Sequence, residues 1–352
     1  MPIAPTYLIY GIYETSFPAN NRSQQYLGNM GLTQMSFANV HWTWMNGEFM
    51  PWAESTVPLS THALHYGTGV FEGIRSYGVN GQSAIFRLDA HLDRFYKSAE
   101  VYGLRIPFNR EQLSEAVCGV IRRNGLIDSY IRPIAYMGAE TLGIRAQCST
   151  ETAILAWPQM VHVNEQSRRH GAKLTVSPYR KFDASMMPTT AKACGQYLNS
   201  RLATMEASRR GFDDALLLNI DGNVAEAAVA NVFLVSGRTL RTNDEKSSIL
   251  MGITRDSILQ LATAEGFNAE VGTITVQDLQ TADEVFLCGT ACEILPVREL
   301  DGARIGRGSP GPVTAQIRSA FDRAKNGTAS EWSHWLHHVA PDEVLVESAV
   351  TA

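Results

Sequence analysis

Apolar side chains along this chain of 352 residues recur in two spacings, one typical of helices and one typical of strands. In RLDAHLDRFYKSAEVYGL, residues Leu88, Leu92, Phe95 and Ala99 recur at intervals of three and four. This spacing predicts an amphipathic helix, with Asp89 as a candidate cap. Similar patterns predict helices at 111–125, 195–211 and 252–266. In the second of these, the apolar face is formed by Leu198, Leu202 and Met205.

Short apolar runs bounded by turn residues predict strands between these helices. They lie at 130–138, 152–161 and 172–180, and a buried strand in ADEVFLCG leads into a tight glycine turn. Two further strands are joined by the turn signal Asp221-Gly222. Because strands and helices mix without a strict βαβ rhythm, the pattern predicts an α+β fold.

The length is typical of about two domains. Residues 1–37 have no sustained period and are interpreted as an irregular extension. A small N-terminal domain is expected at 38–160, and the polar stretch within 161–171 is the interdomain linker. A larger domain is expected at 172–335, followed by a C-terminal tail at 336–352.

Composition and charge exclude several classes of partner. The chain is 45% hydrophobic and 18% charged, and its net charge of −5 includes no basic block, so we expect no nucleic-acid partner. Its start has no basic leader or long apolar run, so neither secretion nor membrane association is predicted. The 5 cysteines form no C-x-x-C pair, which argues against a disulfide framework or a zinc site and favours a cytoplasmic protein. Histidines at 62, 65, 334, 337 and 338 lack acidic or cysteine partners in a metal-binding pattern, so no metal site is predicted.

Lys192 stands among small side chains in MPTTAKACGQY. Desolvation disfavours an ammonium, so a lysine in this setting can become a nucleophile. The same local pattern also fits a lysine on a surface loop. The other lysines, including Lys181 beside Arg180 and Lys325 near a helix end, are interpreted as solvated surface residues.

Two turns have the chemistry of a phosphate site. MGITRD places Gly252, Ile253 and Thr254 at a helix N-terminus, where free N–H groups and the positive end of the helix dipole favour an anion. The CGTA turn adds Thr290 and more backbone donors. Together with an isolated lysine, these turns indicate a phosphorylated aldehyde cofactor, and pyridoxal 5'-phosphate (PLP) is the obvious candidate. The glycines of HYGTGVFEGIR have neither dinucleotide-binding nor P-loop spacing.

Several ordered motifs now carry a resemblance to a known family. The chain closely resembles the fold-type IV PLP enzymes, most of all the branched-chain amino acid aminotransferases, from about Trp42 to Trp335. The motifs are HYGTGVFEGIR, FRLDAHLDRF, YIRP, PTTAKACGQY, NVAEAAVANVF, GITRD, FLCGTACEI and GPVTAQI. The resemblance implies a small α+β domain, a larger domain with a β-barrel-like core and a cofactor in the cleft between them. It also implies a homodimer in which loops of the second subunit close the cleft.

The resemblance assigns roles to particular residues. Lys192 matches the lysine that binds the cofactor covalently, Tyr197 the phenol that hydrogen-bonds its phenolate oxygen, and Glu226 the carboxylate that keeps its pyridine nitrogen protonated. The implied phosphate ligands are Arg94, Ile253, Thr254 and Thr290. The implied substrate-binding residues are Tyr66, Phe71, Gly73, Tyr130, Arg132, His162, Thr290 and Ala291.

The implied reaction is a ping-pong transfer of an amino group between an apolar L-amino acid, branched-chain by default, and 2-oxoglutarate. Arg132 is expected to receive the distal carboxylate of glutamate. Ala227, Val229, Met251, Cys194 and His162 depart from the family pattern, and residues 1–38 have no counterpart in its compact bacterial members. An aminotransferase acting on an unusual or aromatic amino acid is therefore an alternative. A D-amino acid transaminase or an aminodeoxychorismate lyase of the same fold is another, which HYGTGVFEGIR and YIRP disfavour.

Overall fold

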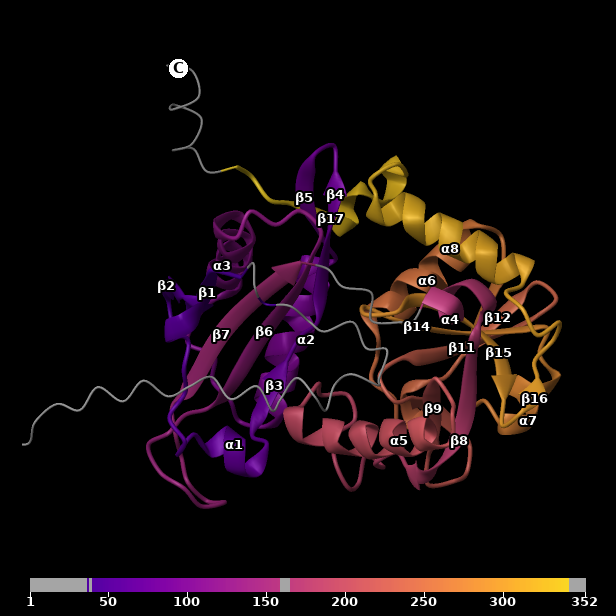
Figure 1. Ribbon diagram of the computed structural model, residues 1–352, viewed down its shortest axis with the longest axis horizontal. Coiled ribbons are helices and arrows are strands. Elements are labelled where there is room, and N and C mark those ends of the chain that lie inside the picture. The colour runs from indigo at the N-terminus through magenta and orange to yellow at the C-terminus, as the bar shows by residue number, and fades with distance from the viewer. Residues whose placement is uncertain (1–36, 38–39, 159–164, 342–352) are drawn as a thin grey trace, which may run out of the picture. The chain divides into compact units, whose positions relative to one another are not determined.

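The computed structural model describes residue 37 and residues 40–158 and 165–341 (Figure 1). The expected N-terminal extension therefore lies outside the described residues, apart from Phe37. His162 and the part of the C-terminal tail beyond residue 341 lie outside them as well. None of the described helices is both long and apolar enough to cross a membrane.

The first of two sheets joins eight strands in the described part of the chain, in the order β17-β5-β4-β6-β7-β1-β2 with β3 paired to β6. They are β1 (Trp42–Met45), β2 (Glu48–Pro51), β3 (Gly69–Phe71), β4 (Ile74–Val79), β5 (Gln82–Phe86), β6 (Ser129–Met137), β7 (Thr150–Pro158) and β17 (Leu336–His338). The short helix α1 (His62–Tyr66) precedes β3, and α2 (Leu88–Val101) and α3 (Arg110–Arg123) cover the sheet. Residues 336–338, which sequence analysis placed in the tail, thus return to the first sheet.

The pattern of buried positions explains these helices. Leu88, Leu92, Phe95 and Ala99 of α2 are all buried, as their spacing predicts. The N-cap of α2 is Arg87, in the left-handed region at φ 55°, so the expectation of an Asp89 cap is wrong. Helix α3 begins at a capping box instead, in which the side chain and backbone of its cap exchange hydrogen bonds with the third helical residue.

The second sheet joins nine strands among the described residues, in the order β10-β9-β8-β15-β14-β11-β12-β13 with β16 paired to β15. They are β8 (Ala172–Arg180), β9 (Asp214–Leu218), β10 (Val224–Ala227), β11 (Asn231–Ser236), β12 (Thr239–Thr242), β13 (Asn268–Val271), β14 (Glu284–Gly289), β15 (Glu293–Leu300) and β16 (Ala303–Arg304). Val224, at one end of this order, bridges Ile274, just beyond β13 at the other end. The sheet is therefore strongly curled, in agreement with the expected barrel-like core.

Helices surround the second sheet, as Figure 1 shows. They are α4 (Glu165–His170), α5 (Tyr197–Arg209), α6 (Ile253–Ala264), α7 (Val276–Thr281) and α8 (Pro312–Lys325). Helix α5 packs on β8 and β9, while α6 and α8 contact each other and β14. Part of the segment interpreted as a linker is thus helical, in α4. The segment between β8 and α5 carries Lys192 and contacts the first sheet through a bridge between Val70 and Ala193.

Candidate active site

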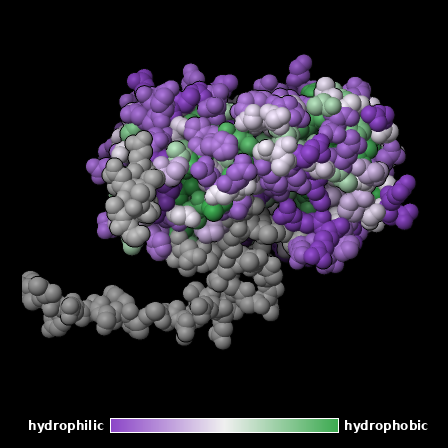
Figure 2. Space-filling view, turned by 90° about the horizontal axis from the view of Figure 1, so that it is seen from above, coloured by the Kyte–Doolittle hydropathy of each residue, from purple (hydrophilic) through white to green (hydrophobic). Residues whose placement is uncertain are grey.

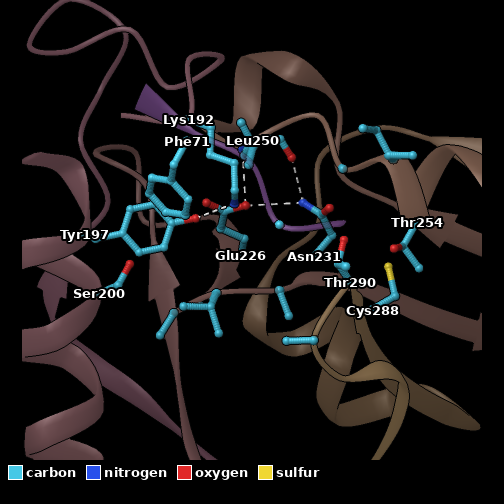
Figure 3. Close-up of a pocket in the computed structure, with 18 of the residues that line it drawn as sticks. Phe71, Lys192, Tyr197, Ser200, Glu226, Asn231, Leu250, Thr254, Cys288 and Thr290 are labelled. Carbon is cyan, nitrogen blue, oxygen red and sulfur yellow. Dashed lines mark hydrogen bonds between the residues drawn. The ribbon is translucent and has the colours of Figure 1, made fainter. Parts of the chain in front are cut away.

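A cavity of about 310 Å³ is lined by side chains from both sheets. This volume lies in the range of small-molecule sites. Of the predicted site residues that the structure describes, all but Tyr66 line it: they are Phe71, Gly73, Arg94, Tyr130, Arg132, Lys192, Tyr197, Glu226, Ile253, Thr254, Thr290 and Ala291. Figure 3 shows Glu226 between Tyr197 and Asn231, with Thr254, Thr290 and Cys288 farther along the cavity.

Lys192 is held from both its backbone and its side chain. Its backbone N–H donates to Ser98 Oγ at 3.0 Å, and its carbonyl accepts from the Phe71 N–H at 3.0 Å. Its Nζ donates to the hydroxyl of Tyr197 at 2.6 Å (Figure 3). Burial, followed by the charge of Arg94, lowers the pKa of Lys192 to about 8. The amine can thus lose its proton near neutral pH, which makes it a nucleophile and a base.

Glu226 is a buried carboxylate with both oxygens engaged. Its Oε2 accepts from Asn231 Nδ2 at 3.2 Å and from the backbone N–H of Leu250 at 3.1 Å. Its Oε1 lies 2.6 Å from the ammonium nitrogen of Lys181. Burial, followed by the charge of Glu226, raises the pKa of Tyr197 to about 12, so its hydroxyl keeps its proton.

The prediction that Lys181 and Lys325 lie at the solvated surface is wrong. Lys181 is only 9% exposed and lines the cavity. Lys325 is also largely buried, and its Nζ lies 2.8 Å from carboxylate oxygens of both Glu293 and Asp322. The burial of these lysines has no local signal in the sequence, because Glu226 and Glu293 belong to strands that are remote along the chain.

Arg94 is fixed by a carboxylate that sequence analysis missed. Its Nε and Nη2 donate to the two oxygens of buried Glu72 at 2.7 and 2.9 Å, and its Nη1 donates to Met251 O at 3.0 Å. His91 is also hydrogen-bonded to Glu72, at 2.7 Å. Although burial alone would raise it, the charges and hydrogen bonds of Arg94 and His91 hold the pKa of Glu72 well below its usual value. A guanidinium has five N–H donors, so Arg94 keeps one on each terminal nitrogen for an anion.

The N-terminus of α6 lies across the cavity and adds backbone donors. Its first residues, Ile253 and Thr254, follow the N-cap Gly252 and have no helical partner for their N–H groups. A Cβ at Gly252 would lie 2.0 Å from Asn231 Oδ1, so only glycine fits against that side chain. Thr290 lies on the turn after β14, where its carbonyl accepts from Arg75 Nη1 at 3.3 Å. The free N–H groups of α6 and of Arg94 have the chemistry that a phosphate site requires.

Arg132 lies among aromatic rings at another wall of the cavity. Its guanidinium carbon lies 4.5 Å from the ring centre of Phe71, 5.5 Å from that of Tyr130 and 6.0 Å from that of Trp157. A Cβ at Gly73 would lie 2.1 Å from the hydroxyl of Tyr130, so this glycine makes room for the phenol. Trp157, which sequence analysis did not single out, stacks on Tyr130 with ring centres 5.0 Å apart. A cation in an apolar surround suits a substrate that is apolar except for one distant carboxylate.

Comparison with protein families gives one decisive match. The model of the amino-transferase class IV family matches residues 69–300, which include both sides of the cavity.

The chain belongs to the class IV aminotransferases.

Relatives of this class IV aminotransferase share most of its length. It is 38% identical over 293 residues to the branched-chain-amino-acid aminotransferase of Pseudomonas aeruginosa, covering 83% of this chain and 95% of the relative. It is 38% identical over 307 residues to the enzyme of that name from Escherichia coli K12, covering 87% and 99%. Among solved structures, one similar protein is the T.th. branched-chain amino acid aminotransferase complexed with N-(5'-phosphopyridoxyl)-L-glutamate. It superposes with a TM-score of 0.82 at 42% identity, and the match covers 86% of this chain and 99% of that one. The Escherichia coli structure gives a TM-score of 0.83 at 38% identity, covering 86% and 100%.

Three departures of this class IV aminotransferase from the family pattern have different positions. Val229 lines the cavity and is 58% exposed, and its effect on the shape of the pocket stays a prediction. Ala227 is fully buried and is not part of the cavity lining. His162 lies outside the described residues. Tyr66, which matches the family pattern, is 43% exposed at the end of α1 and does not line the cavity of its own chain.

Proposed function

We propose that this class IV aminotransferase is a PLP enzyme that moves an amino group between an apolar, branched-chain or related L-amino acid and 2-oxoglutarate. The names of the relatives support this reaction, since both curated relatives are branched-chain-amino-acid aminotransferases. Solved T.th. neighbours are complexed with N-(5'-phosphopyridoxyl)-L-glutamate and with pyridoxamine 5'-phosphate. The similarity extends over most of each chain, so it covers the whole site.

The side chains of the cavity fit PLP. Arg94 keeps two free N–H donors beside the unpaired N–H groups at the start of α6, which suits a phosphate. Because Gly252 has no Cβ, which would lie 2.0 Å from Asn231 Oδ1, the start of α6 can lie directly against Asn231 at this end of the cavity. Lys192 and Glu226 provide an amine and a carboxylate within the same cavity. Ile253, Thr254 and Thr290 complete the proposed phosphate site.

The protein's own groups then bind, orient and move protons. PLP supplies an aldehyde that can take up an amino group and a ring that can accept an electron pair. Lys192 Nζ would hold PLP at its aldehyde, and the amine of this lysine would be the base that moves the substrate's α-proton. Tyr197 donates its hydroxyl proton toward the cofactor's phenolate oxygen. Glu226 holds the ring nitrogen with its negative charge.

Arg132 and the rings around it account for the two substrates. The guanidinium receives the distal carboxylate of glutamate or 2-oxoglutarate, while the rings of Phe71 and Tyr130 contact an apolar side chain. Gly73 and Ala291 form part of the same wall. The side chain of Val229 narrows the cavity, and one methylene of misfit between a substrate and its pocket can change substrate selectivity by roughly 10- to 200-fold.

The observation that carries the proposal is the amine of half-buried Lys192, hydrogen-bonded to Tyr197 in the same cavity as Glu226. The purified protein should be yellow, and borohydride should fix the cofactor on Lys192, as a peptide map would detect. A label on another lysine contradicts the assignment. Activity with 2-oxoglutarate should then be measured against a panel of L- and D-amino acids. Poor turnover of leucine, isoleucine and valine beside another donor contradicts the substrate class, and activity with D-amino acids alone contradicts the stereochemistry.

We also propose a homodimer, because large apolar side chains are exposed around α1. We define the α1 surface as Leu59, Leu64, Tyr66, Leu142, Ile144 and Leu198, all of them exposed. His62 joins its parts, since its Nε2 is hydrogen-bonded to Gly143 O at 2.9 Å and its backbone N–H donates to Gly138 O at 2.8 Å. A Cβ at Gly67, which ends α1, would lie 3.0 Å from the Cα of Gly195, just before α5.

Contiguous apolar surfaces of this kind mark association sites. On the opposite face, shown in Figure 2, hydrophilic side chains predominate and hydrophobic areas are small. A second copy that covers the α1 surface could bring its own Tyr66 to this chain's substrate, which would reconcile the predicted role of Tyr66 with its position. Analytical ultracentrifugation at micromolar concentration should detect a dimer, and an active monomer contradicts the proposed dimer.

The five cysteines are all free, which supports the expected cytoplasmic location.

A further inference from the structure

Lys181 follows directly after β8, where the chain leaves the second sheet toward Lys192. Its backbone N–H donates to Leu218 O at 2.9 Å, and this bond fixes the point from which the side chain enters the cavity. The ammonium nitrogen ends 2.6 Å from Glu226 Oε1, with both side chains almost fully buried. Burial of two charges costs so much solvation that a pair of this kind contributes little net stability, and a specific role is the better explanation.

The acceptor positions of Glu226 indicate that role. A carboxylate offers about four acceptor positions, two on each oxygen. Oε2 already receives two donors, from Asn231 and from the backbone of Leu250. Among the described residues, Oε1 receives Lys181 alone, so one acceptor position remains on the oxygen that Lys181 holds.

We infer that Lys181 is a positioning residue, which fixes Glu226 through Oε1 and shares that carboxylate with the ring nitrogen of PLP. The inference rests on the proposed function, because it takes Glu226 as the partner of that nitrogen. In the cofactor-free protein Lys181 is the cation that balances Glu226. In the PLP-loaded protein the protonated ring nitrogen is a second cation that balances Glu226. Removal of Lys181 therefore harms the cofactor-free protein more than the loaded protein.

The test compares Lys181→Met with Lys181→Arg and with Lys173→Met. Lys173 is a matched control on β8, since its ammonium also pairs with a glutamate, at 3.3 Å from Glu299, but its side chain is 38% exposed. For each variant, Tm is measured with and without PLP, and kcat and KM are measured with 2-oxoglutarate and an active amino donor.

Lys181→Met should lower the Tm of the cofactor-free protein by clearly more than the Tm of the loaded protein. It should lower kcat by about 10- to 100-fold, since a misplaced catalytic group costs factors of this order. The KM of the amino donor should change by less than about twofold, because Lys181 acts through Glu226 and not on the substrate. Lys181→Arg should restore most of kcat, because a guanidinium keeps both the charge and the donors. Lys173→Met should match the wild type in every measurement.

Other outcomes overturn the inference. Equal losses of Tm in both forms with an unchanged kcat would make Lys181 a structural ion pair only. A raised KM with an unchanged kcat would place it against the substrate. If Lys181→Met does not fold, Lys181→Gln keeps a donor without the charge, and a wild-type kcat in that variant refutes the role of the charge. Failure of the wild-type protein to bind PLP would overturn the proposed function together with this inference, whereas the other outcomes leave the proposed function intact.

Discussion

Replacement of Lys192 by methionine should stabilise the cofactor-free protein below pH 8 and abolish transamination. In the unfolded chain the lysine has its ordinary pKa of 10.5, and burial and Arg94 lower the pKa to about 8 in the folded protein. Each pKa unit corresponds to about 1.4 kcal/mol, so the folded protein bears about 3 kcal/mol of destabilisation from this ammonium at neutral pH. Loss of the hydrogen bond to Tyr197 offsets about 1 kcal/mol of the gain.

The sign of the pH dependence follows from proton binding. Between pH 8 and pH 10.5 the unfolded chain binds more protons at Lys192 than the folded protein does, so the stability of the wild type rises with pH in this window. Lys192→Met lacks this rise. Its advantage of about 2 kcal/mol at pH 7 should therefore shrink above pH 8 and disappear at about pH 10, where the remaining penalty equals the lost hydrogen bond.

Urea unfolding of the cofactor-free proteins provides the assay, at several pH values from about 7 to about 10 and at one protein concentration because a dimer is proposed. Lys97→Met is the matched control, since Lys97 is exposed on α2. The difference in free energy of unfolding between this control and the wild type should not change comparably with pH. A gap between Lys192→Met and wild type that stays the same across this pH range would refute the reasoning, as would a variant less stable than wild type at neutral pH.

Two substitutions test the ends of the cavity. Gly252→Ala places a methyl group 2.0 Å from Asn231 Oδ1 and should weaken PLP binding by about 5- to 100-fold, as measured by equilibrium dialysis. Gly272→Ala is the control, because no atom lies within 4 Å of its new methyl group, and it should bind PLP like the wild type. Equal affinity in the two variants contradicts a cofactor site at the start of α6. Arg132→Met should raise the KM of the oxo acid substrate by roughly 10- to 100-fold and leave the KM of leucine within about threefold, because only the oxo acid has a distal carboxylate. Equal increases of both KM values contradict the assignment of Arg132 to that carboxylate.

Periodicity predicted the elements that bury one regular face. The strand at 172–180 coincides with β8, and α2 buries Leu92, Phe95 and Ala99 as their spacing requires. The site itself could not be found from periodicity, because Arg94, Lys192 and Glu226 lie on separate elements. Their selection depended on family motifs, and the fold brings them to one cavity.

The charged residues that support the site were missed for a physical reason. A polar residue in a sequence pattern is assigned to solvent, since charged side chains are rarely buried without a partner. Glu72 and Lys181 are both buried with such partners, Arg94 and Glu226, that are remote in the sequence. Knowledge of the pairing is therefore needed before the burial of either residue can be predicted.

Helix α5 shows a different limit, in which the period is correct but the orientation is reversed. Its spacing identifies an apolar face with Leu198 and Leu202, yet Leu198 is 71% exposed. The buried positions are Ser200, Ala203 and Ala207, whose small side chains let the helix lie close to β8 and β9. An amphipathic helix turns its larger apolar side chains toward the core when its own chain supplies the only apolar surroundings. In the proposed homodimer a second chain would supply them as well, so we expect the outward stripe of α5 to obey the same rule at the interface between subunits.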